Sequence, residues 1–300
     1  MGRVVNLFIH IAEETDDYLS TVLGQMRMFI DICAANRSFV REEWYISSDN
    51  YDTFLIYKYD HQTRSQWEQG AKKHEKEATM VLGHVVYTTK SPKTQKATFS
   101  MSLRRSIKFT NPDIGKERSI QMSIPYSVWL KIDSQKVLSA FQRFCSAIKA
   151  TWACIDWGEY CPNSVYDGNF RLYAADLIDV DPETRLPDIC WAQYISKEMI
   201  DQIPSLSWEN LVPPSEIVQF VEWQGECGIW IQLSKSIIEA DINKRIHLRR
   251  YFNDALYPIS TEKVAKQLLT PYGLIGSEMF PLYAEELEEI KGMVQAWREE

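Results

Sequence analysis

Carboxylate and aromatic side chains alternate in a segment between two predicted strands, from Asp156 to Gly168. Carboxylates attract a basic surface and aromatic rings give broad contact area, so this composition is typical of a surface that binds a basic protein. We predict that six side chains of this loop form the binding site: Asp156, Trp157, Glu159, Tyr160, Tyr166 and Asp167. The alternative is that Trp157 and Tyr160 cover the core while the acids face water.

Catalysis is the other chemistry that this loop could support. Asp156 and Glu159 could act as general acid and general base, but no feature of the sequence assigns these roles. The chain also lacks glycine-rich phosphate loops, Gly-x-Ser-x-Gly elbows and His-Glu-x-x-His pairs, whose mechanics are the most specific. We therefore predict a protein that is not an enzyme and has no catalytic residues. A hydrolase whose carboxylates converge only in three dimensions is the alternative.

Metal-binding and cofactor-binding residues are not indicated either. The five histidines lie on different predicted elements without the spacing of a ligand set. The three carboxylates at residues 179–183 lack the glycine and the distal glutamate of a calcium-binding loop. The six cysteines show no Cys-x-x-Cys spacing and are interpreted as free thiols, although Cys154 and Cys161 are near enough in sequence for a disulfide. We predict no metal site and no cofactor.

The charge of the chain limits its partners. The 41 acidic residues outnumber the 33 lysines and arginines and give a formal net charge of -8. Nucleic-acid binding requires clustered basic residues, so we expect no direct nucleic-acid partner, whereas a basic protein would be attracted. No segment approaches the roughly 20 apolar residues of a membrane-spanning helix, and the apolar start lacks a cleavage site. We predict a soluble, cytoplasmic protein that does not bind membranes.

Apolar periodicity predicts the elements that position the acidic and aromatic loop. Alternation and β-branched or aromatic content predict strands over residues 4–11, 44–46, 53–59, 79–88, 97–103, 118–124, 151–157, 170–178, 189–195, 217–223 and 228–233. Helical spacing and capping residues predict helices over residues 16–33, 62–78, 133–148, 237–256 and 284–297. This order predicts an α+β fold in which a largely antiparallel sheet carries amphipathic helices packed on one face.

The chain is predicted to consist of a large domain and an appendage. Residues 1–257 form the α+β domain, which could be two packed halves divided near residue 130, given its size. Pro258 and a proline-glycine turn at residues 271–273 separate it from a C-terminal helical appendage, residues 258–300. Within the domain, residues 187–233 place aromatic strands around a proline-rich corner, which is interpreted as scaffold.

Four segments carry a family resemblance. They are residues 44–49 (Trp-Tyr-Ile-Ser-Ser-Asp), the helix and strand at 141–157, residues 189–194 (Ile-Cys-Trp-Ala-Gln-Tyr) and residues 228–233 (Gly-Ile-Trp-Ile-Gln-Leu). Together they resemble the immunity protein 52 family of bacterial polymorphic-toxin and type VI secretion systems. Cys190 stands where that family tends to have glycine, and the appendage after Pro258 looks additional.

The resemblance implies a protein that binds a cognate toxin, often one with a restriction-endonuclease-like fold, and blocks its DNase activity. The acidic, aromatic-rich composition agrees with this function, because a nuclease carries cationic groups for phosphate. The expected function is therefore that of a non-catalytic immunity protein that neutralises a secreted toxin. Occlusion of the toxin's active site and indirect inhibition are both open at this stage.

Overall fold

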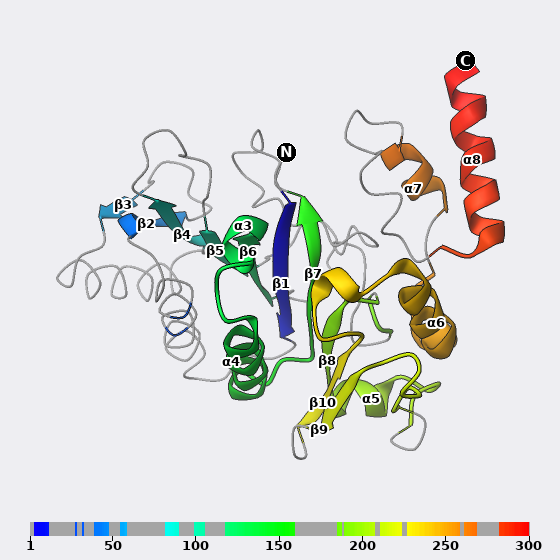
Figure 1. The fold of residues 1–300 in the computed structure, drawn as a ribbon, viewed down its shortest axis with the longest axis horizontal. Coiled ribbons are helices and arrows are strands. Elements are labelled where there is room, and N and C mark those ends of the chain that lie inside the picture. Colours follow the sequence, from blue (N-terminus) through cyan, green and yellow to red (C-terminus); the bar gives the residue numbers. More distant parts are fainter. Residues whose placement is uncertain are drawn as a thin grey trace.

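Figure 1 shows the computed structural model of the chain. The structure describes residues 3–11, 28, 32, 39–47, 55–58, 82–89, 99–105, 118–159, 185–187, 189–207, 211–223, 227–258, 261–268 and 282–299. The predicted helix at 62–78 and the predicted strand at 170–178 lie outside these residues. Of the predicted helix at 16–33, only Met28 and Ile32 are described, and both are helical and pack against the core.

A single antiparallel sheet organises the described part of the chain. Its ten strands are β1 (Arg3–Ile11), β2 (Phe39–Ser47), β3 (Leu55–Lys58), β4 (Leu82–Thr89), β5 (Phe99–Arg105), β6 (Arg118–Pro125), β7 (Trp152–Glu159), β8 (Ala192–Ser196), β9 (Phe220–Trp223) and β10 (Gly228–Gln232). Their order in space is β3-β2-β4-β5-β6-β1-β7-β8-β10-β9. Every neighbouring pair is antiparallel. The predicted α+β class with a largely antiparallel sheet is confirmed.

β1 lies near the middle of this sheet and joins its two halves. It pairs with β6 on one side, where Leu7 faces Met122, and with β7 on the other, where Leu7 faces Ile155. The sheet is therefore continuous across residue 130, the point at which the sequence allowed a division. Four alternate side chains of β1 are completely buried: Val5, Leu7, Ile9 and Ile11. They share one face of the sheet, because successive side chains of a strand point to opposite faces, and the other face of β1 is buried as well.

Eight helical segments accompany the sheet in the described residues. They are α3 (Tyr126–Trp129), α4 (Ser134–Ala147), α5 (Lys197–Gln202), η2 (Ile237–Glu239), α6 (Ile242–Phe252), η3 (Asn253–Ala255), α7 (Thr261–Leu268) and α8 (Ala284–Glu299). The predicted helix at 237–256 is interrupted, because the Asp241 side chain caps α6 by accepting from the backbone N–H of Lys244 at 2.9 Å. Residues 237–239 form a separate 3-10 turn before this cap.

The two ends of the amphipathic helix α4 are set by a capping side chain at its start and a left-handed residue after its end. The Asp133 side chain caps its first turn by accepting from the backbone N–H of Lys136. At its end Lys149 adopts a left-handed φ of 51°, and the Ala150 N–H reaches back to the Cys145 carbonyl at 2.8 Å. The buried stripe of the helix consists of Val137, Leu138, Ala140, Phe141, Phe144 and Cys145.

Helices reach both faces of the sheet. On one face, the ring of Phe141 in α4 lies 6.1 Å from that of Trp230 in β10. Trp230 pairs with Tyr194, which pairs with Ala153, so this face also carries the odd-numbered residues of β7. Asp156 points to the opposite face, where Arg245 of α6 contacts it. The sequence predicted amphipathic helices on one face; α4 follows this expectation, and α6 reaches the other.

The C-terminal helices α7 and α8 have a small hydrophobic cluster of their own. Its buried members are Val264, Ala265, Leu282 and Ile290. Leu287, Met293, Val294 and Trp297 of α8 pack against it and are partly exposed. In Figure 1 α8 projects from the body beside α7. The helical character predicted for residues 284–297 is confirmed, and the extent of the appendage as a separate domain is a prediction.

Candidate functional site

Asp156 lies in a buried strand, although the sequence placed it at the start of an exposed loop. β7 continues through Glu159, and Asp156 is only 5% exposed. Its carboxylate accepts two hydrogen bonds from the Arg245 guanidinium, at 2.5 and 2.6 Å. It also accepts from the backbone N–H groups of Trp157 at 2.7 Å and Trp191 at 3.2 Å.

These four bonds determine what Asp156 can do. A bidentate pair with arginine supplemented by two backbone donors occupies the lone pairs of both carboxylate oxygens. A carboxylate held in this way, inside the protein, has no position from which to touch a partner or exchange a proton with a substrate. In the described conformation Asp156 holds β7, Trp191 and α6 together.

Arg245 was not recognised from the sequence. It lies in a basic stretch of α6 that has the composition of a solvated helix face, yet its side chain is only 6% exposed. No local spacing connects it with Asp156, because the two residues are 89 positions apart. A contact of this kind arises from the packing of α6 on the sheet, and a single sequence carries no signal for it.

The other predicted binding residues have different positions. Trp157 is 7% exposed, and its ring packs on that of Tyr126 at 4.9 Å. Glu159 is the last residue of β7 and pairs with Arg3 of β1; its side chain is not described. Tyr160, Tyr166 and Asp167 lie outside the described residues. A docking role for these last three, and for Glu159, is a prediction that the geometry leaves in place.

Trp191 forms the second half of the buried network. Its indole N–H donates to the Ser234 backbone carbonyl at 3.0 Å and to the Ser234 hydroxyl at 3.2 Å. The ring meets that of Trp129 edge-on at 6.1 Å. Trp191, which directly precedes β8, is therefore hydrogen-bonded to the segment after β10. This agrees with the scaffold role expected for residues 187–233.

The sheet face that α6 reaches is unusually polar for a buried surface. Asn6, His10, Asp156 and Gln193 all point to this face, and each is at most 7% exposed. Burying such groups is costly unless they are hydrogen-bonded. The four bonds to Asp156 meet that requirement for the only carboxylate among them.

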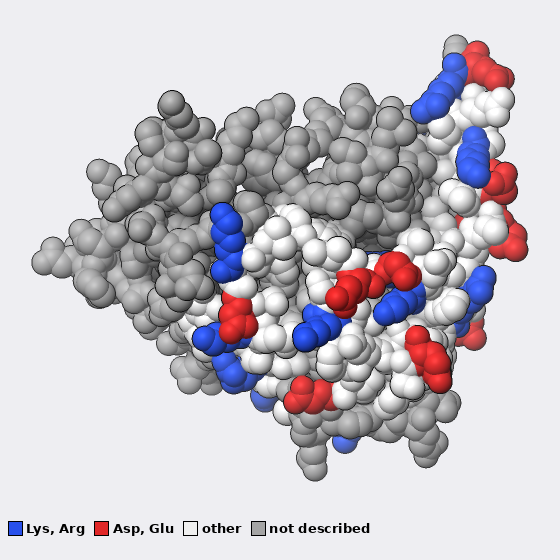
Figure 2. Space-filling view, viewed as in Figure 1, with Lys and Arg blue, Asp and Glu red and all other residues white. Residues whose placement is uncertain are grey.

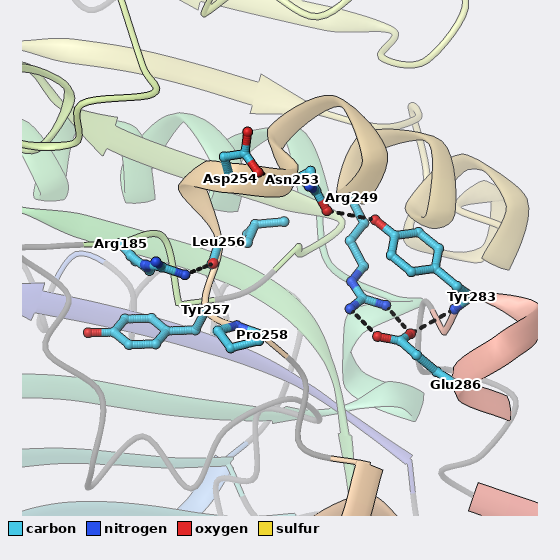
Figure 3. Close-up of a pocket in the computed structure, with 9 residues that line it drawn as sticks. All are labelled: Arg185, Arg249, Asn253, Asp254, Leu256, Tyr257, Pro258, Tyr283 and Glu286. Atoms are coloured by element: carbon cyan, nitrogen blue, oxygen red, sulfur yellow. Dashed lines mark hydrogen bonds and ion pairs between the residues drawn. The ribbon is translucent and has the colours of Figure 1, made fainter. Parts of the chain in front are cut away.

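A pocket of about 540 Å³ lies between the end of α6 and the start of α8 (Figure 3). Arg249 of α6 and Glu286 of α8 meet on one side of it in a bidentate pair, at 2.5 and 2.6 Å. The Arg249 guanidinium also stacks 4.1 Å from the centre of the Tyr283 ring. On the other side, Arg185 donates to the backbone carbonyl of Leu256 at 3.2 Å. The pocket marks the joint between the body and the appendage.

The charge of Glu286 is stabilised at this joint. Burial acts to raise the pKa of its carboxyl group, but hydrogen bonds from Arg249 and from the Tyr283 N–H outweigh it and leave the pKa below its ordinary value of 4.5. Glu286 is therefore ionised at neutral pH and neutralises Arg249. The arrangement connects two elements and provides no uncompensated charge for catalysis.

The described cysteines have the properties of structural thiols. Cys145, Cys154 and Cys190 are buried, and Cys227 is exposed. The disulfide between Cys154 and Cys161 that the sequence left open involves Cys161, which lies outside the described residues. Burial raises the pKa of Cys145 well above its usual value, so this thiol remains protonated and is a poor nucleophile.

The described ranges contain neither a metal-binding cluster nor a membrane-spanning helix. No group of three or more His, Cys, Asp or Glu side chains there is arranged to hold a metal ion. Likewise, none of the helices in this part of the chain combines the length and the apolar composition needed to cross a bilayer.

The described charges do not form an area of one sign on the face shown in Figure 2. Lysine and arginine side chains are interspersed there with aspartate and glutamate over an otherwise uncharged surface. The net charge of -8 refers to the whole chain. A docking surface on this face would therefore depend on individual contacts more than on a broad acidic field.

The fold is shared with a secretion-related protein of known structure. The "Pseudomonas aeruginosa T6SS protein PA0821" superposes with a TM-score of 0.58 at 10% sequence identity, over 85% of this chain and 78% of that one. No protein-family model matches the chain, and no curated protein matches it. The resemblance to the immunity protein 52 family is thus not confirmed by these comparisons, whereas the α+β architecture is common to both structures.

Proposed function

We propose that this protein is a non-catalytic immunity protein that binds and neutralises a secreted toxin of a type VI secretion system. The observation that carries the proposal is the fold shared with a T6SS protein over 85% of the chain. The resemblance of four sequence segments to an immunity family points in the same direction. A common fold alone does not define a function, so the proposal also depends on the chemistry of this chain.

That chemistry supports binding over catalysis. Asp156, the described member of the suggested acid-base pair, is held by Arg245 and two backbone N–H groups inside the sheet. Glu286 is also paired with Arg249, at a partly exposed position beside the pocket. A general acid or base requires access to the substrate and a proton that it can exchange, and the buried Asp156 does not meet this condition.

The proposed partner is a basic protein, and a nuclease is the kind of toxin that fits best. The chain has a formal net charge of -8, and opposite net charge accelerates association. A nuclease needs a cationic surface for phosphate, and an acidic protein can cover such a surface. The complex would form in the cytoplasm, where an immunity protein protects the cell that makes it.

Co-expression with the toxin candidate encoded beside this gene tests the proposal. We expect the toxin alone to arrest growth, the pair to grow normally, and an inactive toxin variant to co-purify with this protein in a stoichiometric complex. Failure both to restore growth and to form a complex would refute the immunity function. Replacing Glu159 and Asp167 together by lysine tests the acidic loop; the matched control is the same change at Glu285 and Glu288, two exposed residues of α8.

A further inference from the structure

The strand β9 occupies one edge of the sheet. Within the described residues, β10 is its only neighbour in the sheet order. The outer edge of a strand in this position presents backbone N–H and C=O groups that can pair with another extended chain. Natural edges are usually protected, so the side chains of β9 determine whether this one is suited to binding.

The side chains of β9 alternate between the core and the solvent. Val221 packs against the hydrophobic core, whereas Phe220 is 41% exposed and Glu222 is also exposed. Phe220 pairs with Gln232 and Glu222 pairs with Trp230, so both exposed side chains project from the same face. The edge therefore combines an exposed aromatic ring, an exposed carboxylate and a row of backbone groups within four residues.

The charge of β9 distinguishes between two possible partners: a second copy of this chain and a basic strand from another protein. If two copies of the chain paired antiparallel through β9 with the two Glu222 residues opposite each other, the like charges would destabilise the strand pair. The net charge of -8 on each copy adds to this repulsion. A strand with lysine or arginine opposite Glu222 and an apolar residue opposite Phe220 would instead be complementary.

We propose that β9 is a docking edge that adds one extended strand from a partner protein to the sheet, with basic residues facing Glu222 and apolar residues facing Phe220. Backbone hydrogen bonds would supply affinity, and the two exposed side chains would supply selectivity. This inference rests on the proposed function in taking the toxin as the partner.

Synthetic peptides test the edge without a toxin. The probes are an alternating lysine-valine hexapeptide, its glutamate-valine counterpart, and the lysine peptide with alternate backbone nitrogens methylated. We expect only the unmethylated lysine peptide to bind the full chain and to slow hydrogen exchange at residues 220–223. Equal binding of the methylated peptide, or absence of protection at β9 with every probe, would overturn the proposal.

A charge-reversal pair tests selectivity. Glu222→Lys should weaken binding of the lysine peptide about fivefold, the upper range for one cross-strand pair, and should favour the glutamate peptide. Glu285→Lys, which makes the same charge change on α8, should leave both affinities unchanged. Equal effects of the two substitutions would show that net charge, and not pairing at β9, governs binding. Both residues are exposed, so the fold of each variant can be verified by its unchanged thermal unfolding.

The same variants in the toxin complex separate the two proposals. If the complex forms and growth is restored, but β9 exchanges freely and Glu222→Lys binds like wild type, only the docking edge is refuted. If no complex forms and growth is not restored, the immunity function is refuted, while the peptide experiment still decides whether β9 accepts a basic strand.

Discussion

The Asp156 carboxylate and the Arg245 guanidinium form a bidentate ion pair inside the protein, with side chains only 7% and 6% exposed. The pair connects the central strand β7 with α6, across 89 positions of sequence. Because Trp157 and Trp191 also donate backbone N–H groups to the carboxylate, the buried negative charge is fully hydrogen-bonded. The ion pair thus fixes where α6 lies against the sheet.

Asp156→Asn should destabilise the protein strongly. The amide keeps the size of the side chain but leaves the Arg245 charge buried without a counter-charge, and breaking such a pair costs about 3–5 kcal/mol. Urea unfolding followed by circular dichroism measures the free energy of unfolding. A loss below about 1 kcal/mol, the value for a solvent-exposed pair, would contradict the buried geometry.

The double variant Asp156→Asn with Arg245→Met is the control for this prediction. Methionine removes the unpaired charge and retains an apolar side chain of similar length, so the double variant should be more stable than Asp156→Asn alone. The loss of stability in the double variant should therefore be smaller than the sum of the losses in Asp156→Asn and in Arg245→Met, since the two residues are in direct contact. Additive losses would show that the two side chains act independently.

Gly228→Ala should destabilise the pairing of β10 with β8. A Cβ at this position would lie 2.3 Å from the Ile195 carbonyl oxygen and 2.8 Å from the Tyr194 hydroxyl. The carbonyl belongs to the paired strand and cannot move aside, so we expect a loss of about 1–3 kcal/mol in unfolding free energy. Wild-type stability in this variant would mean that the two strands are further apart in solution.

Gly292→Ala is the matched control. Gly292 lies in α8, and an added Cβ would meet nothing within 4 Å. Alanine is favoured over glycine within a helix by about 0.8–1.0 kcal/mol, so the helicity and thermal stability of α8 should increase. A loss of stability would contradict the open surroundings of this residue.

The sequence could predict the strands and helices of this fold because their signals are local. Alternation over residues 4–11 and 118–124 corresponds to β1 and β6, and the stripe from Val137 to Phe144 corresponds to the buried face of α4. The start of α6 was misplaced because Ser236 and Asp241 are both good caps, and only the tertiary structure shows that each begins its own helix.

The candidate site was harder to predict because its determinants are not local. Asp156 follows an apolar run and precedes aromatic residues, a pattern that fits the end of a strand as well as the start of a loop. The distinction depends on Arg245, whose burial results from helix packing. Tryptophan is common at protein interfaces, yet Trp157 and Trp191 pack in the core. Large aromatic residues occur in both places, so the residue type alone does not distinguish them.

Tyr194→Phe should lower stability at neutral pH and change its alkaline dependence. The hydroxyl donates to the Cys227 carbonyl at 2.8 Å, and losing this bond should cost about 0.5–1.5 kcal/mol, because the carbonyl still accepts from the Lys197 N–H. Burial is the main cause that raises the pKa of Tyr194 above its ordinary value of 10.0, with smaller effects from Cys145, Cys227 and Glu198. Unfolded Tyr194 therefore loses its proton at lower pH than folded Tyr194.

The higher pKa of Tyr194 in the folded protein determines how its contribution to stability changes with pH. The stabilising contribution of Tyr194 is complete below pH 10.0 and is lost as the pH rises from there toward the folded-state pKa. The stability difference between wild type and Tyr194→Phe should thus narrow above about pH 10. Urea unfolding of both proteins at about pH 8 and about pH 11 measures it; a constant difference would contradict the raised pKa.

Glu286→Gln should loosen the attachment of α8 to the body. The carboxylate accepts two bonds from Arg249 and one from the Tyr283 N–H, and an amide can replace only part of this set. Since the pair is partly exposed, we expect a loss of about 1 kcal/mol, seen as lower hydrogen-exchange protection in α8. Glu288→Gln, at an exposed pair with Lys291, should leave that protection unchanged.

Acid should produce the same loosening in the wild-type protein. The folded-state pKa of Glu286 lies below its ordinary value of 4.5, so its contribution is present above pH 4.5 and is lost as the pH falls through the lower folded-state value. Protection factors for α8, corrected for intrinsic exchange, should therefore decline below pH 4.5 in wild type and stay flat in Glu286→Gln. Equal declines in both proteins would assign the acid response to another carboxyl group and remove Glu286 as the residue that holds α8 in place.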